Sequence, residues 1–226
     1  MMNRRNLTKQ RKAFTMIELV FAIVIIGILA ALSLPRIDRD LRQGAADNIL
    51  SAVRYTQHLA LNDNKTDPTD TNWQQKLWMI RFTISANNMG SFYTVSSDLD
   101  NSGTVNKTEC ALDPINGKYM YNTSGTTVGI DSDESPNIFI GKKYSIDSLT
   151  PSGGCNSQHI AFDNLGRPFN GLKTTSGGTL ATNDYANYMS SDCNMTFGFV
   201  DTSISPVSII ISTETGYAYI DGQDDS

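Results

Sequence analysis

The sequence predicts an α+β protein in which a long N-terminal membrane-spanning helix packs on an antiparallel β-sheet head. Residues 14–34 are apolar almost throughout, and residues 35–61 repeat apolar side chains at three- and four-residue steps. Residues 62–226 instead contain short runs rich in β-branched and aromatic side chains, separated by turn residues. The 226 residues are enough for one such head with a core of its own.

Residues 1–13 form a basic leader. They include five Lys or Arg side chains and no acid, although the whole chain has 18 basic and 23 acidic residues. A basic start before an acidic body is typical of a segment that stays in the cytoplasm while the body crosses the membrane. The net charge of -5 also argues against a nucleic-acid-binding protein, which needs a basic surface.

The apolar run 14–34 is long enough to cross a membrane, because about 20 helical residues span the core of a bilayer. A plain anchor and a cleaved secretory signal are alternatives, and Ala30 and Ala31 would suit an ordinary signal peptidase. Glu18 argues against both alternatives. It is the single charge in the run, and a carboxylate within an apolar span costs about 2.5–3.5 kcal/mol.

The segment Lys12–Pro35 resembles the signal and N-terminal helix of type IV pilins and of type II secretion pseudopilins. The shared pattern is a basic leader, the small residue Ala13, then Phe14-Thr15-x-x-Glu18 and the apolar run. The resemblance implies cleavage between Ala13 and Phe14 by a prepilin peptidase, N-methylation of Phe14, and docking of each new subunit through Glu18. The family usually has Gly where this chain has Ala13, so we expect slower processing.

The chemistry of assembly follows from this cleavage. The new amine of Phe14 would lie four residues from Glu18, and the amine of one subunit can meet the Glu18 carboxylate of its neighbour. In apolar packing this pair would set the axial register, because an unpaired buried charge is costly. Pro35, which has a counterpart in the family, removes a helical hydrogen bond and predicts a kink.

The amphipathic helix 35–61 should pack on a sheet and end at the turn-forming residues 62–64. A hairpin turn is expected at 213–216, between the last two strands. The predicted strands are residues 76–84, 91–95, 137–141, 159–163, 195–200, 207–212 and 217–221. Residues 159–169 and 207–220 resemble the end of H-type minor pseudopilins of type II secretion and related minor pilins. Within the first of these, residues 166–168 are interpreted as a tight turn.

Residues 98–109 have the spacing of a twelve-residue calcium loop of the EF-hand type. Gly103 lies at the sharp turn, and Glu109 closes the loop. The preceding segment is strand-like, so we expect an EF-hand-like loop that holds one structural Ca²⁺ in the β-rich head, with a solvated turn as the alternative. The predicted ligands are Asp98, Asp100, Ser102, Thr104, Asn106 and Glu109.

The three cysteines, Cys110, Cys155 and Cys193, form no CxxC pair. A disulfide between Cys155 and Cys193 is favoured in an exported body because both lie in the late, loop-rich region. Three free or buried thiols are the alternative. His58 and His159 flank no obvious nucleophile, and no phosphate-binding glycine loop follows a strand, so we do not expect an enzyme.

These features predict a structural subunit of a type IV pilus-like filament, most like a minor pseudopilin of a type II secretion system that exports proteins. A major or minor pilin for adhesion, motility or DNA uptake is one alternative. A non-polymerising, membrane-anchored calcium-binding domain is another. The expected partners are other pilin-like subunits, a prepilin peptidase and an inner-membrane assembly platform. The expected location is the bacterial inner membrane, with a single span and a periplasmic head, before entry into a filament.

Overall fold

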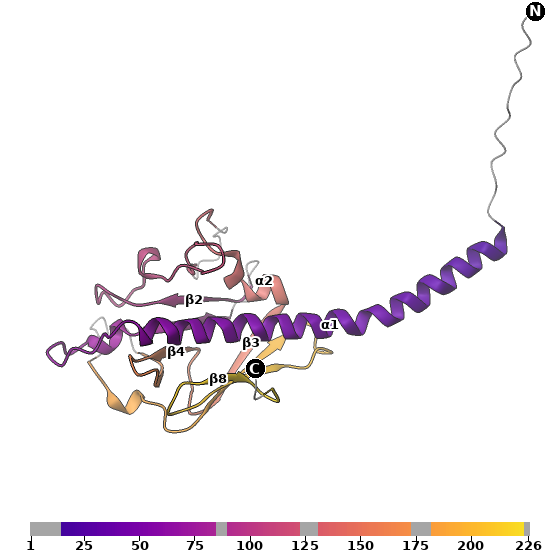
Figure 1. The fold of residues 1–226 in the computed structure, drawn as a ribbon. Coiled ribbons are helices and arrows are strands. Elements are labelled where there is room, and N and C mark those ends of the chain that lie inside the picture. Colours follow the sequence, from indigo (N-terminus) through magenta and orange to yellow (C-terminus); the bar gives the residue numbers. More distant parts are fainter. Residues whose placement is uncertain (1–14, 85–89, 123–130, 173–181, 224–226) are drawn as a thin grey trace, which may run out of the picture. The chain divides into compact units, whose positions relative to one another are not determined.

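The computed structural model describes residues 15–84, 90–122, 131–172 and 182–223 (Figure 1). Its longest element, α1 (Met16–Leu61), is a continuous helix of 46 residues. The backbone stays helical through Pro35, so the proline does not end the helix. The chain divides into two compact units, residues 1–40 and 41–226, and α1 contributes to both.

The first unit contains the N-terminal part of α1. From residue 15 to residue 29 every side chain is exposed, and most of these side chains are large and apolar. Among the described residues, no helix combines the length and the apolar character needed to cross a membrane. Phe14 and the side chains at positions 30–34, which belong to the predicted span, lie outside the described residues.

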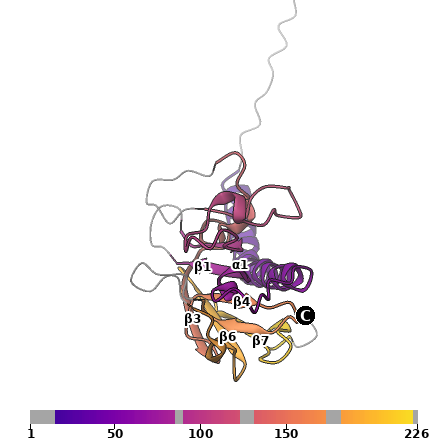
Figure 2. The same cartoon turned by 90° about the vertical axis from the view of Figure 1, so that its left-hand side faces the viewer.

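The second unit is built on two four-stranded antiparallel sheets, with strand orders β2-β1-β4-β5 and β3-β6-β7-β8. Figure 2 looks almost along α1, with the labelled strands of both sheets beside it. The strands are β1 (Trp78–Thr83), β2 (Phe92–Ser96), β3 (Ile146–Gly153), β4 (His159–Phe162), β5 (Pro168–Asn170), β6 (Cys193–Phe199), β7 (Val207–Ile211) and β8 (Ala218–Ile220).

The second half of α1 packs on these sheets, as the amphipathic pattern predicts. Ile49 and Val53 are buried in one core with residues of both sheets, because their spacing places them on one face of the helix. The guanidinium of Arg54 donates to the carbonyl oxygen of Ala218 at 2.7 and 3.0 Å, which fixes the helix to β8. The helix ends at the predicted turn, where Asn62 caps the carbonyl oxygen of residue 58 at 2.7 Å.

Aromatic packing joins the two sheets, and a disulfide links the end of β3 to its neighbour β6 within the second sheet. Phe82 of β1 and Phe197 of β6 pack edge to face with ring centroids 5.1 Å apart, an arrangement that aromatic pairs prefer. Cys155 and Cys193 form a disulfide across 38 residues, and this is the pair that the sequence favoured. The bond ties the loop after β3 to the start of β6. Cys110 is a buried free thiol.

The strand prediction is wrong at one place and incomplete at two. Residues 137–141 are not a strand but lie across a short 3-10 helix, Pro136–Ile138, and the helix α2 (Ile140–Tyr144). Ser135 caps the first of these through its side chain, and Pro136 occupies the first helical turn, which favours helix over strand. The sequence analysis also missed β3 and β5. The polar edge strand β3 contains a proline, and β5 has only three residues.

Candidate functional site

The start of α1 is held by a reciprocal hydrogen-bonding arrangement. The carboxylate of Glu18 accepts from the backbone N–H of Thr15 at 2.9 Å and from its hydroxyl at 2.8 Å. The hydroxyl oxygen of Thr15 in turn accepts from the backbone N–H of Glu18 at 3.3 Å. This is a capping box, which satisfies amide groups that a helix start leaves without partners.

Glu18 therefore has a local structural role as well as the predicted docking role. This cap was not predicted, although Thr-x-x-Glu before an apolar run is itself the signature of a capping box. Glu18 is exposed on a single chain, so its carboxylate is accessible to a neighbouring molecule. The predicted cleavage residues, Ala13 and Phe14, lie outside the described residues.

The three acidic residues among the predicted calcium ligands lie close together. Carboxylate oxygens of Asp98, Asp100 and Glu109 lie within 4.8 Å of one another. Asp98 and Glu109 are buried and Asp100 is exposed, so the cluster opens to solvent on one side. The turn between them uses left-handed backbone at Asn101 (φ 58°) and Gly103 (φ 79°), which the short polar Asn and the glycine tolerate best.

Backbone amides hold this loop closed around its acids. The Asp98 carboxylate accepts from the N–H groups of Ser102 at 3.0 Å and Gly103 at 2.8 Å. The Glu109 carboxylate accepts from the N–H groups of Leu99 at 2.9 Å and Asn106 at 2.8 Å. The loop is therefore preorganised, because its first and last acids are already fixed against its backbone.

The remaining predicted ligands make hydrogen bonds within the loop. The Ser102 hydroxyl donates to the carbonyl oxygen of Thr104 at 2.9 Å. Asn106 is the N-cap of the 3-10 helix Lys107–Glu109, so its side chain accepts from the Glu109 amide. The loop follows β2, as the strand-like preceding segment predicted, and its last three residues form this short helix.

The electrostatics of the loop fit a hard cation. Burial, together with the nearby carboxylates of Asp100 and Glu109, raises the pKa of the Asp98 carboxyl, whereas hydrogen bonds from Ser102 lower the pKa of Asp100. None of the ion pairs among the described residues involves an acid of this cluster. Oxygen donors with uncompensated negative charge are the ligand set that Ca²⁺ prefers.

Comparison with known proteins adds one finding at the N-terminus. Residues 8–34 match the family model described as the prokaryotic N-terminal methylation motif. The chain carries a prepilin-type signal. This signal supports a type IV pilin-like or pseudopilin subunit, which a prepilin peptidase processes and which assembles with other pilin subunits. No curated protein and no solved structure matches the chain significantly.

Two turns of the head contact α1 near its C-terminal end. Gln57 of α1 donates to the carbonyl oxygens of Gly166 at 3.0 Å and Thr215 at 2.8 Å. The buried Asp163 accepts from the Arg167 guanidinium, and the two form an ion pair at 2.7 Å. The turn between β4 and β5 therefore covers residues 163–167, slightly before the predicted turn at 166–168, whose last residue already belongs to β5. These contacts join the two segments that carry the second sequence resemblance.

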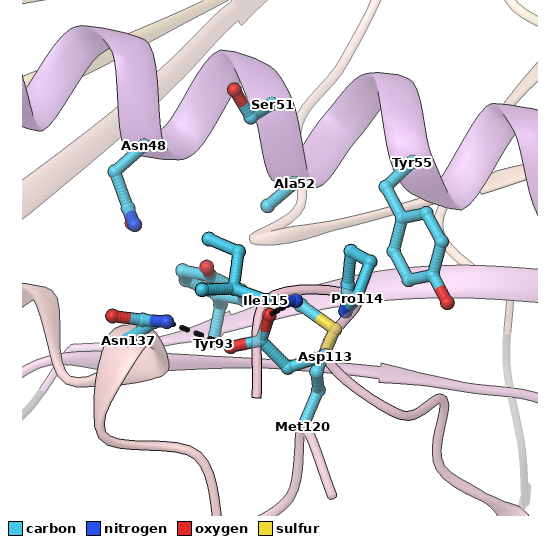
Figure 3. Close-up of a pocket in the computed structure, with 10 residues that line it drawn as sticks. All are labelled: Asn48, Ser51, Ala52, Tyr55, Tyr93, Asp113, Pro114, Ile115, Met120 and Asn137. Atoms are coloured by element: carbon cyan, nitrogen blue, oxygen red, sulfur yellow. Dashed lines mark hydrogen bonds between the residues drawn. The ribbon is translucent and has the colours of Figure 1, made fainter. Parts of the chain in front are cut away.

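Asp113, another buried acid, organises the loop beside the second half of α1 (Figure 3). It accepts from the Ile115 backbone amide at 2.8 Å and from the Asn137 side chain at 2.8 Å. The hollow above it has a volume of about 70 Å³ and is lined largely by apolar atoms, including those of Ala52 and Tyr55. The role of Asp113 was not predicted, although an acid followed by Pro-Ile-Asn-Gly is a turn signal.

Proposed function

We propose that the protein is a minor pseudopilin of a type II secretion system, a structural subunit that enters a short periplasmic filament. The observation that carries this proposal is the prepilin-type signal at residues 8–34, which leads into a helix that continues into an α+β head. The proposed location is the bacterial inner membrane, with the head in the periplasm. The proposed partners are other pilin-like subunits and the assembly platform.

Docking through Glu18 gives the proposal its mechanism. A capping box uses the carboxylate as a hydrogen-bond acceptor, and Gln can take the same place in the box. Docking to the positive amine of a neighbouring subunit instead requires the negative charge. The two roles of Glu18 can therefore be separated by substitution.

The decisive test compares three full-length variants for incorporation into filaments in cells. Glu18→Gln keeps the cap and removes the charge, whereas Thr15→Ala removes the cap and keeps the charge. We expect Glu18→Gln and Glu18→Ala to lose incorporation and Thr15→Ala to retain most of it. Normal incorporation of Glu18→Gln would contradict the docking mechanism. Long surface filaments that require this subunit would favour a pilin over a pseudopilin.

We also propose that residues 98–109 bind one structural Ca²⁺. The residues that would hold it are Asp98, Asp100 and Glu109, with the remaining loop oxygens as further donors. The ion would neutralise the clustered carboxylates and stabilise the loop, since metal binding couples to folding. Calorimetric titration of the full chain in detergent should give one site, which Asp98→Asn or Glu109→Gln removes. A wild-type chain that binds no calcium would exclude this role.

A further inference from the structure

A hollow beside α2 is bordered by two exposed lysines. It has a volume of about 410 Å³ and is lined, largely through apolar atoms, by Pro136, Asn137, Phe139, Lys142 and Lys143. The two lysines are exposed, whereas Phe139 is buried in the core. The hollow therefore combines apolar walls with two positive charges at its border.

The head does not neutralise these two lysines. Among the described residues, no ion pair includes Lys142 or Lys143, and no acid lines the hollow. The Lys143 ammonium donates to the side-chain oxygen of Asn137 at 3.3 Å and lies 5.3 Å from the centre of the Tyr144 ring. Adjacent cations without a counter-ion in the head attract an anion from outside it.

The lysines are also close, along the chain, to the proposed membrane span. The helix α2 packs beside α1 (Figure 1), since a Cβ added to Gly44 would lie 3.2 Å from the Tyr144 ring. Gly44 follows the apolar run 14–34 by ten helical residues, which cover about 15 Å. Lipid headgroups extend about 5–8 Å beyond the hydrocarbon core, and charges are screened only over about 8–10 Å. The two lysines are therefore within electrostatic range of the headgroups.

We propose that the hollow beside α2 binds the headgroup of an anionic phospholipid while the subunit is anchored in the membrane. The phosphate would bind the ammonium groups of Lys142 and Lys143, and the apolar walls would cover the glycerol part of the lipid. This inference rests on the proposed membrane location and adds a lipid contact of the head to it. Entry of the subunit into a filament would break this contact.

Hydrogen exchange on the full chain, reconstituted into vesicles, tests the lipid contact. The vesicles contain phosphatidylcholine alone or an equal mixture of phosphatidylcholine and phosphatidylglycerol. We expect the mixture to slow exchange of the Lys143 and Ser145 amides, which donate to carbonyl oxygens within and before α2, about fivefold or more. One lysine near an anionic surface contributes about that factor. The Gly216 amide, in the turn that contacts Gln57, should exchange equally in both kinds of vesicle.

Paired variants show whether the two lysines cause this effect. The pair Lys142→Gln and Lys143→Gln should lose most of the slowing, whereas Lys142→Arg with Lys143→Arg should keep it, because the charge is retained. The matched control is the pair Lys65→Gln and Lys76→Gln. It removes the same charge from a segment beyond the C-terminal end of α1, so it should also keep the slowing.

The outcomes separate the lipid site from the membrane location. Equal exchange of the α2 amides in both kinds of vesicle overturns the lipid site, and so does slowing that survives the Gln pair or is equally lost in the control pair. Flotation of the same vesicles tests the location separately. A chain that does not float with the vesicles contradicts the proposed location and this inference with it, whereas a chain that floats without slowing overturns the lipid site alone.

Discussion

Neutralising Asp98 should remove the stabilisation that calcium gives to the head. Asp98 is 1% exposed, and its two carboxylate oxygens accept from the amides of Ser102 and Gly103. Asn keeps the shape and one acceptor oxygen but loses the charge that binds the ion. In the absence of calcium, we expect Asp98→Asn to change the stability of the head only slightly. The lost hydrogen bond to a backbone amide is offset by removal of a buried carboxylate, and burial raises the pKa of that carboxyl.

The magnitude follows from linkage. A ligand present at 100 times its Kd stabilises the folded state by about 2.7 kcal/mol. For a domain of this size, each kcal/mol raises Tm by about 2–4 °C, so calcium should raise the wild-type Tm by about 5–10 °C.

The assay is thermal unfolding of the full chain in detergent, followed by circular dichroism with calcium or with a chelator. Asp98→Asn should show less than about 2 °C of calcium-dependent shift. Asp147→Asn, an exposed acid on β3, should keep the full shift. Equal shifts in the wild type and Asp98→Asn would refute the assignment of Asp98 as a ligand.

Two further predictions concern the stability of the head. Gly216→Ala should cost about 2–4 kcal/mol in urea unfolding, because its φ is 64° and an added Cβ would overlap the Gly166 carbonyl oxygen. Gly117→Ala, at φ 69° with open space around it, should cost only about 1–2 kcal/mol; equal costs would contradict the docking of the two turns. Burial, and secondly the positive charge of Arg81, lowers the pKa of His159 from its ordinary value of 6.5. The neutral side chain therefore contributes to stability above pH 6.5, and this contribution is lost as the pH falls and His159 becomes protonated. Unfolding measured from pH 7.5 to 5 should show this loss, and His159→Gln should reduce it; an unchanged profile would contradict the assignment.

The parts of the fold that follow local rules could be predicted from the sequence. The spacing of Ile49 and Val53 predicted the buried face of α1, and the β-branched run at residues 207–211 predicted β7. The segment 137–141 has equal strand character, but a capped proline turn directs it into helices. A hydrophobic pattern alone does not contain that information, because the cap depends on Ser135.

The candidate site was likewise predicted from the sequence only in part. The ligand spacing of residues 98–109 predicted that Asp98 and Glu109 would meet, since twelve residues with a central glycine close into a loop. The ion-pair partners of Lys107 could not be predicted, because Asp131 and Asp133 lie more than twenty residues away in sequence and reach Lys107 only through the fold. The capping role of Glu18 could have been predicted from its spacing to Thr15.

The central claim is that the chain is a processed, pilin-like subunit, and the mass of its N-terminus tests it most directly. The protein should be recovered from membranes of cells with and without the prepilin peptidase, and its N-terminal peptide measured. We expect a chain that begins at N-methylated Phe14 when the peptidase is present and an intact leader when it is absent. A leader that persists in the presence of the peptidase, or a cut near Ala31, would contradict the claim.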